Sequence, residues 1–266
     1  MISKLELSIY AVIGLACLVF ITGFSGKKPV DDTIILTEKN TVSLMMPVME
    51  DTIATLERQL LAKSDKLGKH DVIYLVLNTP GGSIDAGNNF IRLAKALPQE
   101  VATITIFSAS MGFQIVENLG TRYMADNGVL MSHRAAVGGV EGQIPGNAFT
   151  RLYFLLEMVT NLDKIASDRA GMGIEDYQAM IKDELWMGPE NAVALKFADK
   201  AVKVRCDETL RGQGDIQTIN LGFFGMANIA FDKCPLITAP TQVTGDKSAV
   251  EVLGKSKQEL VKYFNY

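Results

Sequence analysis

The chain has 266 residues, of which 48% are hydrophobic and 21% charged, so it is neither disordered nor too short to bury a full core. Its 26 lysines and arginines against 30 aspartates and glutamates give a formal net charge of −4, which excludes an electrostatic nucleic-acid binder. With three cysteines in no CxxC pair and two histidines, no zinc-type ligand spacing can be assembled, and we expect no cofactor.

An uncharged apolar run lies near the start of the chain, from Leu7 to Gly26. As a helix this run would reach about 30 Å, which is the hydrocarbon thickness of a bilayer. We therefore expect residues 1–26 to be a membrane anchor or a signal sequence, with the catalytic part outside the cytoplasm. Gly23–Ser25 has the small-x-small form of a signal-peptidase site, so cleavage there stays open.

Residues 27–205 show alternating strand and helix patterns, which predict one α/β domain built from right-handed crossovers. Val72–Leu77 is apolar throughout, as is typical of a strand covered on both faces of a parallel sheet. The predicted strands are, in chain order, Thr33–Leu36, Val72–Leu77, Val101–Phe107, Thr121–Met124, Val129–Ser132 and Ala201–Val204. The predicted helices are Pro47–Leu61, Ile84–Leu97, Ser110–Leu119, a long helix after the glycine-rich stretch Gly138–Gly146, and two short helices around Trp186.

The long helix carries apolar residues at helical spacing, which we interpret as core packing: Leu155, Met158, Val159, Leu162 and Ile165. Residues 206–266 change in character, because polar turns there alternate with short apolar pieces before a predicted helix at Ser248–Phe264. We interpret them as a C-terminal extension that is either docked on the domain or mediates assembly. Cys206 and Cys234 would be able to pair in an oxidising compartment.

Three short segments that follow predicted strands carry the groups that acyl transfer requires. Gly81-Gly82 can turn backbone amides towards a ligand, because glycine tolerates dihedral angles that other residues avoid. Ser110 begins a predicted helix, so its hydroxyl and the next amide lie in the positive end of the helix dipole. His133 ends a further strand at the same sheet edge. Taken singly, these residues would be an ordinary turn, a helix N-cap and a packed histidine.

In their order and spacing, Asn78–Ser83, Ala109–Gly112 and Met131–His133 resemble three successive signatures of the Clp-type serine peptidases, whose fold is shared with crotonases and signal peptide peptidases. The likeness covers roughly Thr33–Val204. It implies a Clp/crotonase-like α/β fold of repeated β-β-α units with a handle helix. The transmembrane or signal helix at residues 1–26 would precede that fold.

The same resemblance assigns the chemical roles. Ser110 is the nucleophile and His133 the general base, as in a serine–histidine–acid triad. The amides of Gly82 and Met111 form the oxyanion hole. No metal site is implied.

The acid of the triad is assigned to Glu184, which precedes a tryptophan as the family's acid precedes an aromatic residue, with Asp183 as the fallback. Glutamate is longer than aspartate, so it can orient an imidazole only from a backbone that lies slightly farther back. Arg134 stands where the family commonly has glutamine, and an arginine there is expected to alter subunit contacts or the substrate groove.

The resemblance implies a serine endopeptidase that acts on peptides or loosely folded proteins and forms a homo-oligomeric ring through the handle helix. If the domain is exported, ATP is absent, so an ATPase unfoldase partner is not expected. Two alternatives stay open. One is a catalytically inactive ring scaffold at a membrane, and the other is a crotonase-like acyl-CoA enzyme, for which no basic cluster to receive the CoA phosphates is visible.

Overall fold

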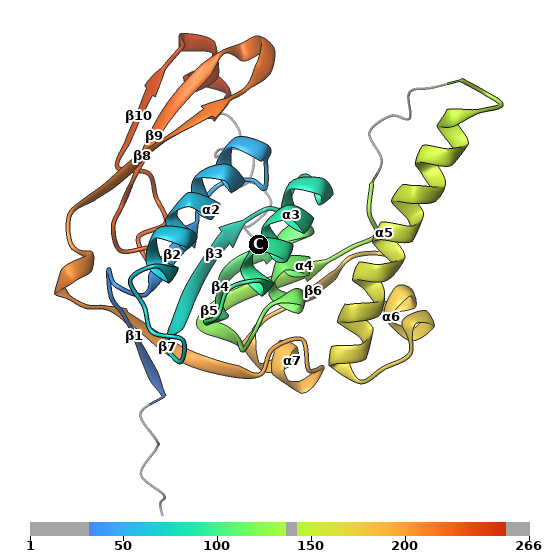
Figure 1. Cartoon of the computed structure of the whole chain (residues 1–266), viewed down its shortest axis with the longest axis horizontal. Helices are drawn as coiled ribbons and strands as arrows, with labels where there is room; N and C mark the ends of the chain where they lie inside the picture. Colours follow the sequence, from blue (N-terminus) through green and yellow to red (C-terminus); the bar gives the residue numbers. More distant parts are fainter. Residues whose placement is uncertain (1–31, 137–142, 254–266) are drawn as a thin grey trace, which may run out of the picture. The chain divides into compact units, whose positions relative to one another are not determined.

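In the computed structural model, strands and helices alternate over residues 32–136 and 143–253, which are the residues that the structure describes (Figure 1). A seven-stranded sheet has the order β1-β7-β5-β4-β3-β2, and β6 pairs with β5. Its strands are β1 Thr33–Leu36, β2 Thr41–Leu44, β3 Val72–Thr79, β4 Glu100–Ala109, β5 Arg122–Ser132, β6 Leu185–Met187 and β7 Lys200–Cys206. The helices are α2 Glu50–Ser64, α3 Ile84–Lys95, α4 Met111–Asn118, α5 Asn147–Ala170, α6 Ile174–Met180 and α7 Pro189–Ala194.

Strand β3 is covered on both faces, as its continuous apolar sequence predicts. Ile73, Leu75 and Leu77 belong to the large core shared with the helices, which includes Leu56 of α2. Alternate residues point to the opposite face, where Val76 joins a second cluster. This period of two fixes which side of the sheet each side chain occupies.

The neighbouring pairs β2–β3, β3–β4, β4–β5 and β5–β7 are all parallel. The carboxyl ends of these strands therefore lie at one edge of the sheet, which is where an open parallel sheet places its functional loops. The register brings Ala109, at the end of β4, opposite Met131 near the end of β5. Residues that follow these two strands are thereby neighbours.

Several predicted elements differ from those observed. Thr121–Met124 and Val129–Ser132 form one strand, β5, because the ladder with β4 continues across an irregularity between Thr105 and Phe107. Short helices flank Trp186 as predicted, but Trp186 itself lies in β6, paired with β5. Strands β2 and β6 were not predicted, since segments this short carry little periodicity of their own.

Helix α5 is not a core helix along its whole length. Among the five residues predicted to pack in the core, only Leu162 is buried, and the others are half-buried. The N-terminal half of the helix exposes large apolar side chains instead: Phe149, Leu152, Tyr153, Phe154 and Leu156. Apolar residues at helical spacing indicate that one face of the helix is buried against another surface. They do not indicate whether that surface belongs to the same chain or to a partner.

The C-terminal extension forms an antiparallel sheet in the order β10-β9-β8, which the sequence patterns did not predict. Its strands are β8 Gln213–Asn220, β9 Met226–Asp232 and β10 Gln242–Gly245, and short 3-10 turns lie at Glu208–Leu210 and Gly222–Phe224. Ile219, Ile229 and Phe231 pack with Met45 and Met46, which follow β2. The extension is thus docked on the preceding domain. Residues 247–253 are helical, and the rest of the helix predicted at Ser248–Phe264 lies outside the described residues.

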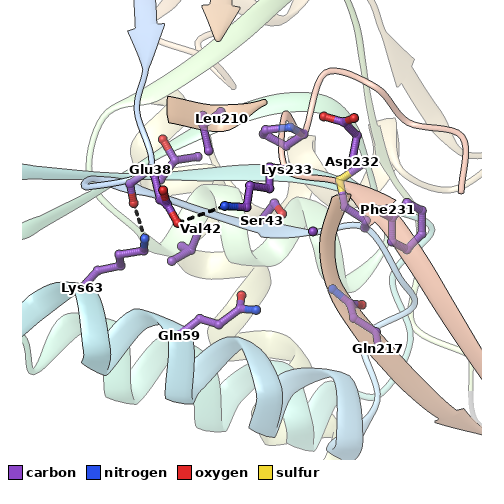
Figure 2. A pocket seen from close by; sticks show the side chains of 14 residues that line it. Glu38, Val42, Ser43, Gln59, Lys63, Leu210, Gln217, Phe231, Asp232 and Lys233 are labelled. Atoms are coloured by element: carbon purple, nitrogen blue, oxygen red, sulfur yellow. Dashed lines mark hydrogen bonds and ion pairs between the residues drawn. The ribbon is translucent and has the colours of Figure 1, made fainter. Parts of the chain in front are cut away.

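Figure 2 shows a cavity of about 230 Å³ where this extension meets β2 and α2. Lys63 donates a hydrogen bond to the backbone carbonyl of Glu38, and Lys233 lies 3.5 Å from the Glu38 carboxylate. Leu210 and Phe231 are among the apolar residues that line this cavity. The Lys233–Glu38 contact connects the extension to the domain, and none of the predicted catalytic residues lines this cavity.

Cys206 and Cys234 form a disulfide with a Cα–Cα distance of 5.9 Å, so the end of β7 is covalently linked to the C-terminal extension. We expect Cys206→Ser to lower the free energy of unfolding by about 3–4 kcal/mol, because the bond closes a long loop in the unfolded chain. Urea unfolding of the oxidised and the serine variant measures this. Equal stabilities would contradict the prediction, and a Cys206→Ser/Cys234→Ser double variant that no longer responds to reductant is the control.

A buried charged cluster ties β5 to α4 and to the turn before β7. Arg122 bonds to Glu117 and to Asp199, each at 2.6 Å, and Arg169 lies 3.8 Å from Asp199. Burial raises the pKa of Glu117 to about 8, although Arg122 acts in the opposite direction. Burial also opposes ionisation of Asp199, but hydrogen bonds from Arg122 outweigh it and lower the pKa of Asp199. The cluster therefore holds one firmly ionised carboxylate beside two guanidinium groups.

The predicted membrane anchor or signal at residues 1–26 lies outside the described residues. Within 32–136 and 143–253, no helix combines the length and the apolar character that crossing a bilayer would need.

Candidate active site

The turn after β3 brings Gly81 against the start of α4 and Gly82 against Val48. Gly81 has φ +89°, and a Cβ atom there would lie 2.5 Å from the carbonyl oxygen of Ala109 and 2.6 Å from Cβ of Ser110. Only glycine fits at this distance. Val48 fixes the turn, because its N–H donates to the Gly81 carbonyl at 2.8 Å and it bridges to Gly82.

Ser110 lies between β4 and α4 with φ 56° and ψ −117°, a conformation that non-glycine residues rarely adopt. Such strain persists only where the surroundings fix it, and it is concentrated at functional sites. Here the N–H of Ser110 donates to the Met131 carbonyl at 3.0 Å, and its own carbonyl accepts from the N–H of Gln114 at 3.2 Å. The β4–β5 ladder and the first turn of α4 therefore hold Ser110 in place.

His133 follows β5 directly. The pairing of Ala109 with Met131 puts the residues after β4 and β5 at one edge of the sheet, so Ser110 and His133 come from adjacent strand ends. The His133 side chain is half-buried. This is the placement that the order of the strands predicts.

One cavity of about 180 Å³ is lined by Gly82, Ser110, Met111 and His133 together. The structure therefore brings together four of the residues singled out from the sequence, which come from three separate segments. Within the described part of the chain no direct hydrogen bond joins Ser110 to His133. The remaining lining residues are Ile84, Gln114, Ala135, Ala136, Val159, Leu162 and Asp163.

Glu184 and Asp183 do not line this cavity, and both are exposed. The Glu184 carboxylate accepts a hydrogen bond from the Trp186 indole N–H at 2.9 Å, and its backbone has φ 70°. In the antiparallel β5–β6 ladder Ser132 pairs with Leu185. The ladder ends at this pair, so Glu184 directly precedes the first residue of β6 and His133 directly follows the last residue of β5.

Two polar residues of the cavity were not identified from the sequence, namely Asp163 on α5 and Gln114 on α4. Both are almost fully buried. Asp163 directly follows Leu162, which belongs to the apolar stripe of the long helix. Burying a charged side chain beside such a stripe is costly, so its position there could have marked it as a functional residue. Arg134 is exposed, and its guanidinium donates to the carbonyl of Gln178 on α6 at 3.4 Å.

Comparisons with known proteins all point to one family. The model of the Clp protease family matches residues 25–205. The chain is 29% identical over 178 residues to the ATP-dependent Clp protease proteolytic subunit of Streptococcus gordonii, which covers 66% of this chain and 90% of that protein. It is 29% identical over 168 residues to the subunit of the same name from Streptococcus salivarius, and this match covers 62% of this chain and 85% of that protein. It is 28% identical over 178 residues to the subunit of the same name from Streptococcus thermophilus, and this match covers 66% of this chain and 90% of that protein.

Proposed function

Because the chain belongs to the Clp protease family of serine-type peptidases, we propose that it hydrolyses peptide bonds with Ser110 as nucleophile and His133 as general base. One observation carries the proposal: Gly82, Ser110, Met111 and His133, from three separate segments, line one cavity. A hydroxyl, an imidazole and two main-chain amides are the groups that acyl transfer needs at one point.

In the proposed mechanism the Ser110 hydroxyl attacks the scissile carbonyl while His133 accepts its proton. The tetrahedral oxyanion is stabilised by the N–H groups of Gly82 and Met111. His133 then returns the proton to the leaving amine, which leaves an acyl group on Ser110, and water releases it by the same steps. Glu184 serves as the acid that orients the imidazole and stabilises its charged form. This role is supported by the pairing of Ser132 with Leu185, because His133 and Glu184 are the chain neighbours of that pair.

Labelling of the wild-type protein with a fluorophosphonate, followed by peptide mass spectrometry, tests the proposal. We expect the phosphonyl group on Ser110 alone, because only a serine beside a base and an oxyanion hole reacts readily. Absence of labelling would favour the inactive scaffold. Labelling at another serine would contradict the assigned nucleophile.

Assembly is proposed to use helix α5. The large apolar side chains of its N-terminal half are exposed, and a contiguous exposed apolar surface is typical of an interaction site. We propose a homo-oligomer, in ring form as the family resemblance implies. Sedimentation of the protein shows whether it associates.

The proposed location is outside the cytoplasm, with the chain tethered or exported through the apolar run 7–26. The Cys206–Cys234 disulfide supports this, because disulfides persist mainly in oxidising compartments. There the substrates are peptides or loosely folded proteins, and ATP-driven unfolding is not part of the reaction.

A further inference from the structure

The cavity that holds Ser110 and His133 extends to helix α5, and its walls there are mainly apolar. Ile84, Met111 and Leu162 contribute to them. Among the described residues that line the cavity there is no lysine or arginine, and Asp163 is the one carboxylate. The cavity therefore combines a hydrocarbon lining with a single negative group.

Asp163 is 6% exposed, so its carboxylate has little access to solvent. Within the described part of the chain its one hydrogen bond comes from the Gln178 amide, which donates to Oδ2 at 3.1 Å. The positive charge of Arg134 favours the ionised form of Asp163, but the Arg134 guanidinium donates its hydrogen bond to the Gln178 carbonyl. Burial raises the pKa of Asp163, although the Gln178 hydrogen bond and Arg134 counteract this. A carboxylate in such a place lacks a close counter-ion.

Gln114 supplies a second, independent observation. Its side chain is 9% exposed, and within the described residues Oε1 has no hydrogen-bond partner. Leaving a buried acceptor unpaired costs about 1–3 kcal/mol, so such groups are rare unless a ligand or water pairs with them. Ser132 and Tyr177 hydrogen-bond to each other at 2.7 Å, and the Gln114 side chain also interacts with the Tyr177 hydroxyl, while Gln114 Oε1 itself stays unpaired. The cavity thus presents a carboxylate that accepts one hydrogen bond and a buried amide oxygen that accepts none among the described residues.

We propose that this cavity binds the side chain of the substrate residue that supplies the scissile carbonyl, and that it selects arginine or lysine there. The apolar walls accommodate the methylene stem, and Asp163 and Gln114 accept hydrogen bonds from the cationic end group. An apolar side chain of similar size would leave the Gln114 oxygen unpaired and the Asp163 carboxylate without a close counter-ion, and a site built for hydrogen bonding discriminates strongly against such a ligand. This inference rests on the proposed peptidase function, which places the scissile carbonyl at Ser110.

Binding to the Ser110→Ala protein tests the pocket without requiring turnover. Isothermal titration with N-acetyl-Ala-Ala-Xaa amides compares arginine with its neutral isostere citrulline and with leucine. We expect arginine to bind at least about tenfold more tightly than either, since charge and donors are both needed. Binding of leucine or citrulline as tightly as arginine would overturn the proposal.

Two further variants assign the effect to the named groups. Asp163→Asn in the Ser110→Ala background should remove the preference of arginine over citrulline. Asp168→Asn, on the exposed side of the same helix, should keep it. Gln114→Met removes the unpaired acceptor without leaving a buried polar atom, so it should fold well and reduce arginine binding several-fold. An unchanged preference in both Asp163→Asn and Gln114→Met would refute the assignment.

Hydrolysis by the wild-type protein separates this inference from the proposed function. Fluorophosphonate labelling at Ser110 with faster cleavage after leucine than after arginine would refute the specificity alone. Failure of labelling together with selective arginine binding would refute the peptidase and leave the cation pocket. If both succeed, kcat/KM should be at least about tenfold higher for arginine than for citrulline.

Discussion

Ser110→Ala should leave the protein folded and reduce kcat/KM for peptide cleavage by roughly 10⁴- to 10⁶-fold, because the nucleophile acts as one unit with its base. The strained backbone at position 110 is held by the N–H bond to Met131 and by the first turn of α4, and these contacts involve no side-chain atom of Ser110. Peptide hydrolysis under substrate excess measures the loss, and circular dichroism checks the fold.

Ser64→Ala is the matched control. Ser64 donates to the side chain of Gln99 at 2.7 Å, and Gln99 directly precedes β4, at the opposite end of that strand from Ser110. This variant should keep full activity. Cleavage by Ser110→Ala at more than a hundredth of the wild-type rate would mean that another residue is the nucleophile.

Arg122→Met should lower the free energy of unfolding by about 3–5 kcal/mol, because it removes the shared partner of two acidic groups. Arg122 is 4% exposed and Glu117 is fully buried, so water cannot replace the contact between them, whereas Asp199 is 39% exposed. Glu117 Oε1 is already without a hydrogen-bond partner among the described residues, so losing the contact at Oε2 would leave this carboxyl wholly unpaired. Urea unfolding followed by tryptophan fluorescence measures the change.

Lys164→Met serves as the comparison. Lys164 pairs with Asp168 at 2.7 Å, but both side chains are mostly exposed, and exposed pairs of this kind contribute less than about 1 kcal/mol. If the two variants lost similar stability, burial would not be what makes the Arg122 cluster important.

The placement of the candidate site could be predicted because it depends on short sequence patterns, namely the strands and turns, and on their order along the chain. Val72–Leu77 is apolar on both faces, which predicts a central parallel strand, and the glycine pair after it predicts a sharp turn. Once the strands are parallel, Ser110 and His133 must appear at one sheet edge. Their roles in catalysis stay predictions until the labelling experiment is done.

Asp163 and Gln114 could not be predicted in this way. Each lies on a helix whose face towards the cavity is defined by a partner element far away in the sequence. The exposed apolar half of α5 shows the same limit, since its spacing matches that of a core helix. The C-terminal sheet was missed because its short strands are stabilised by packing on Met45 and Met46.

Sequence alone determined the alternation of strands and helices, the glycine turn and the order in which an alcohol and an imidazole follow their strands. These features depend on residues that are close together in the sequence, because backbone dihedral preferences set the turns and the alternation of side chains sets the strands. Tertiary structure decided which side chains share the cavity, that Cys206 and Cys234 pair, and which acceptors stay buried without a donor. Such properties come from the approach of distant segments, and burial then sets the electrostatic cost of each polar group.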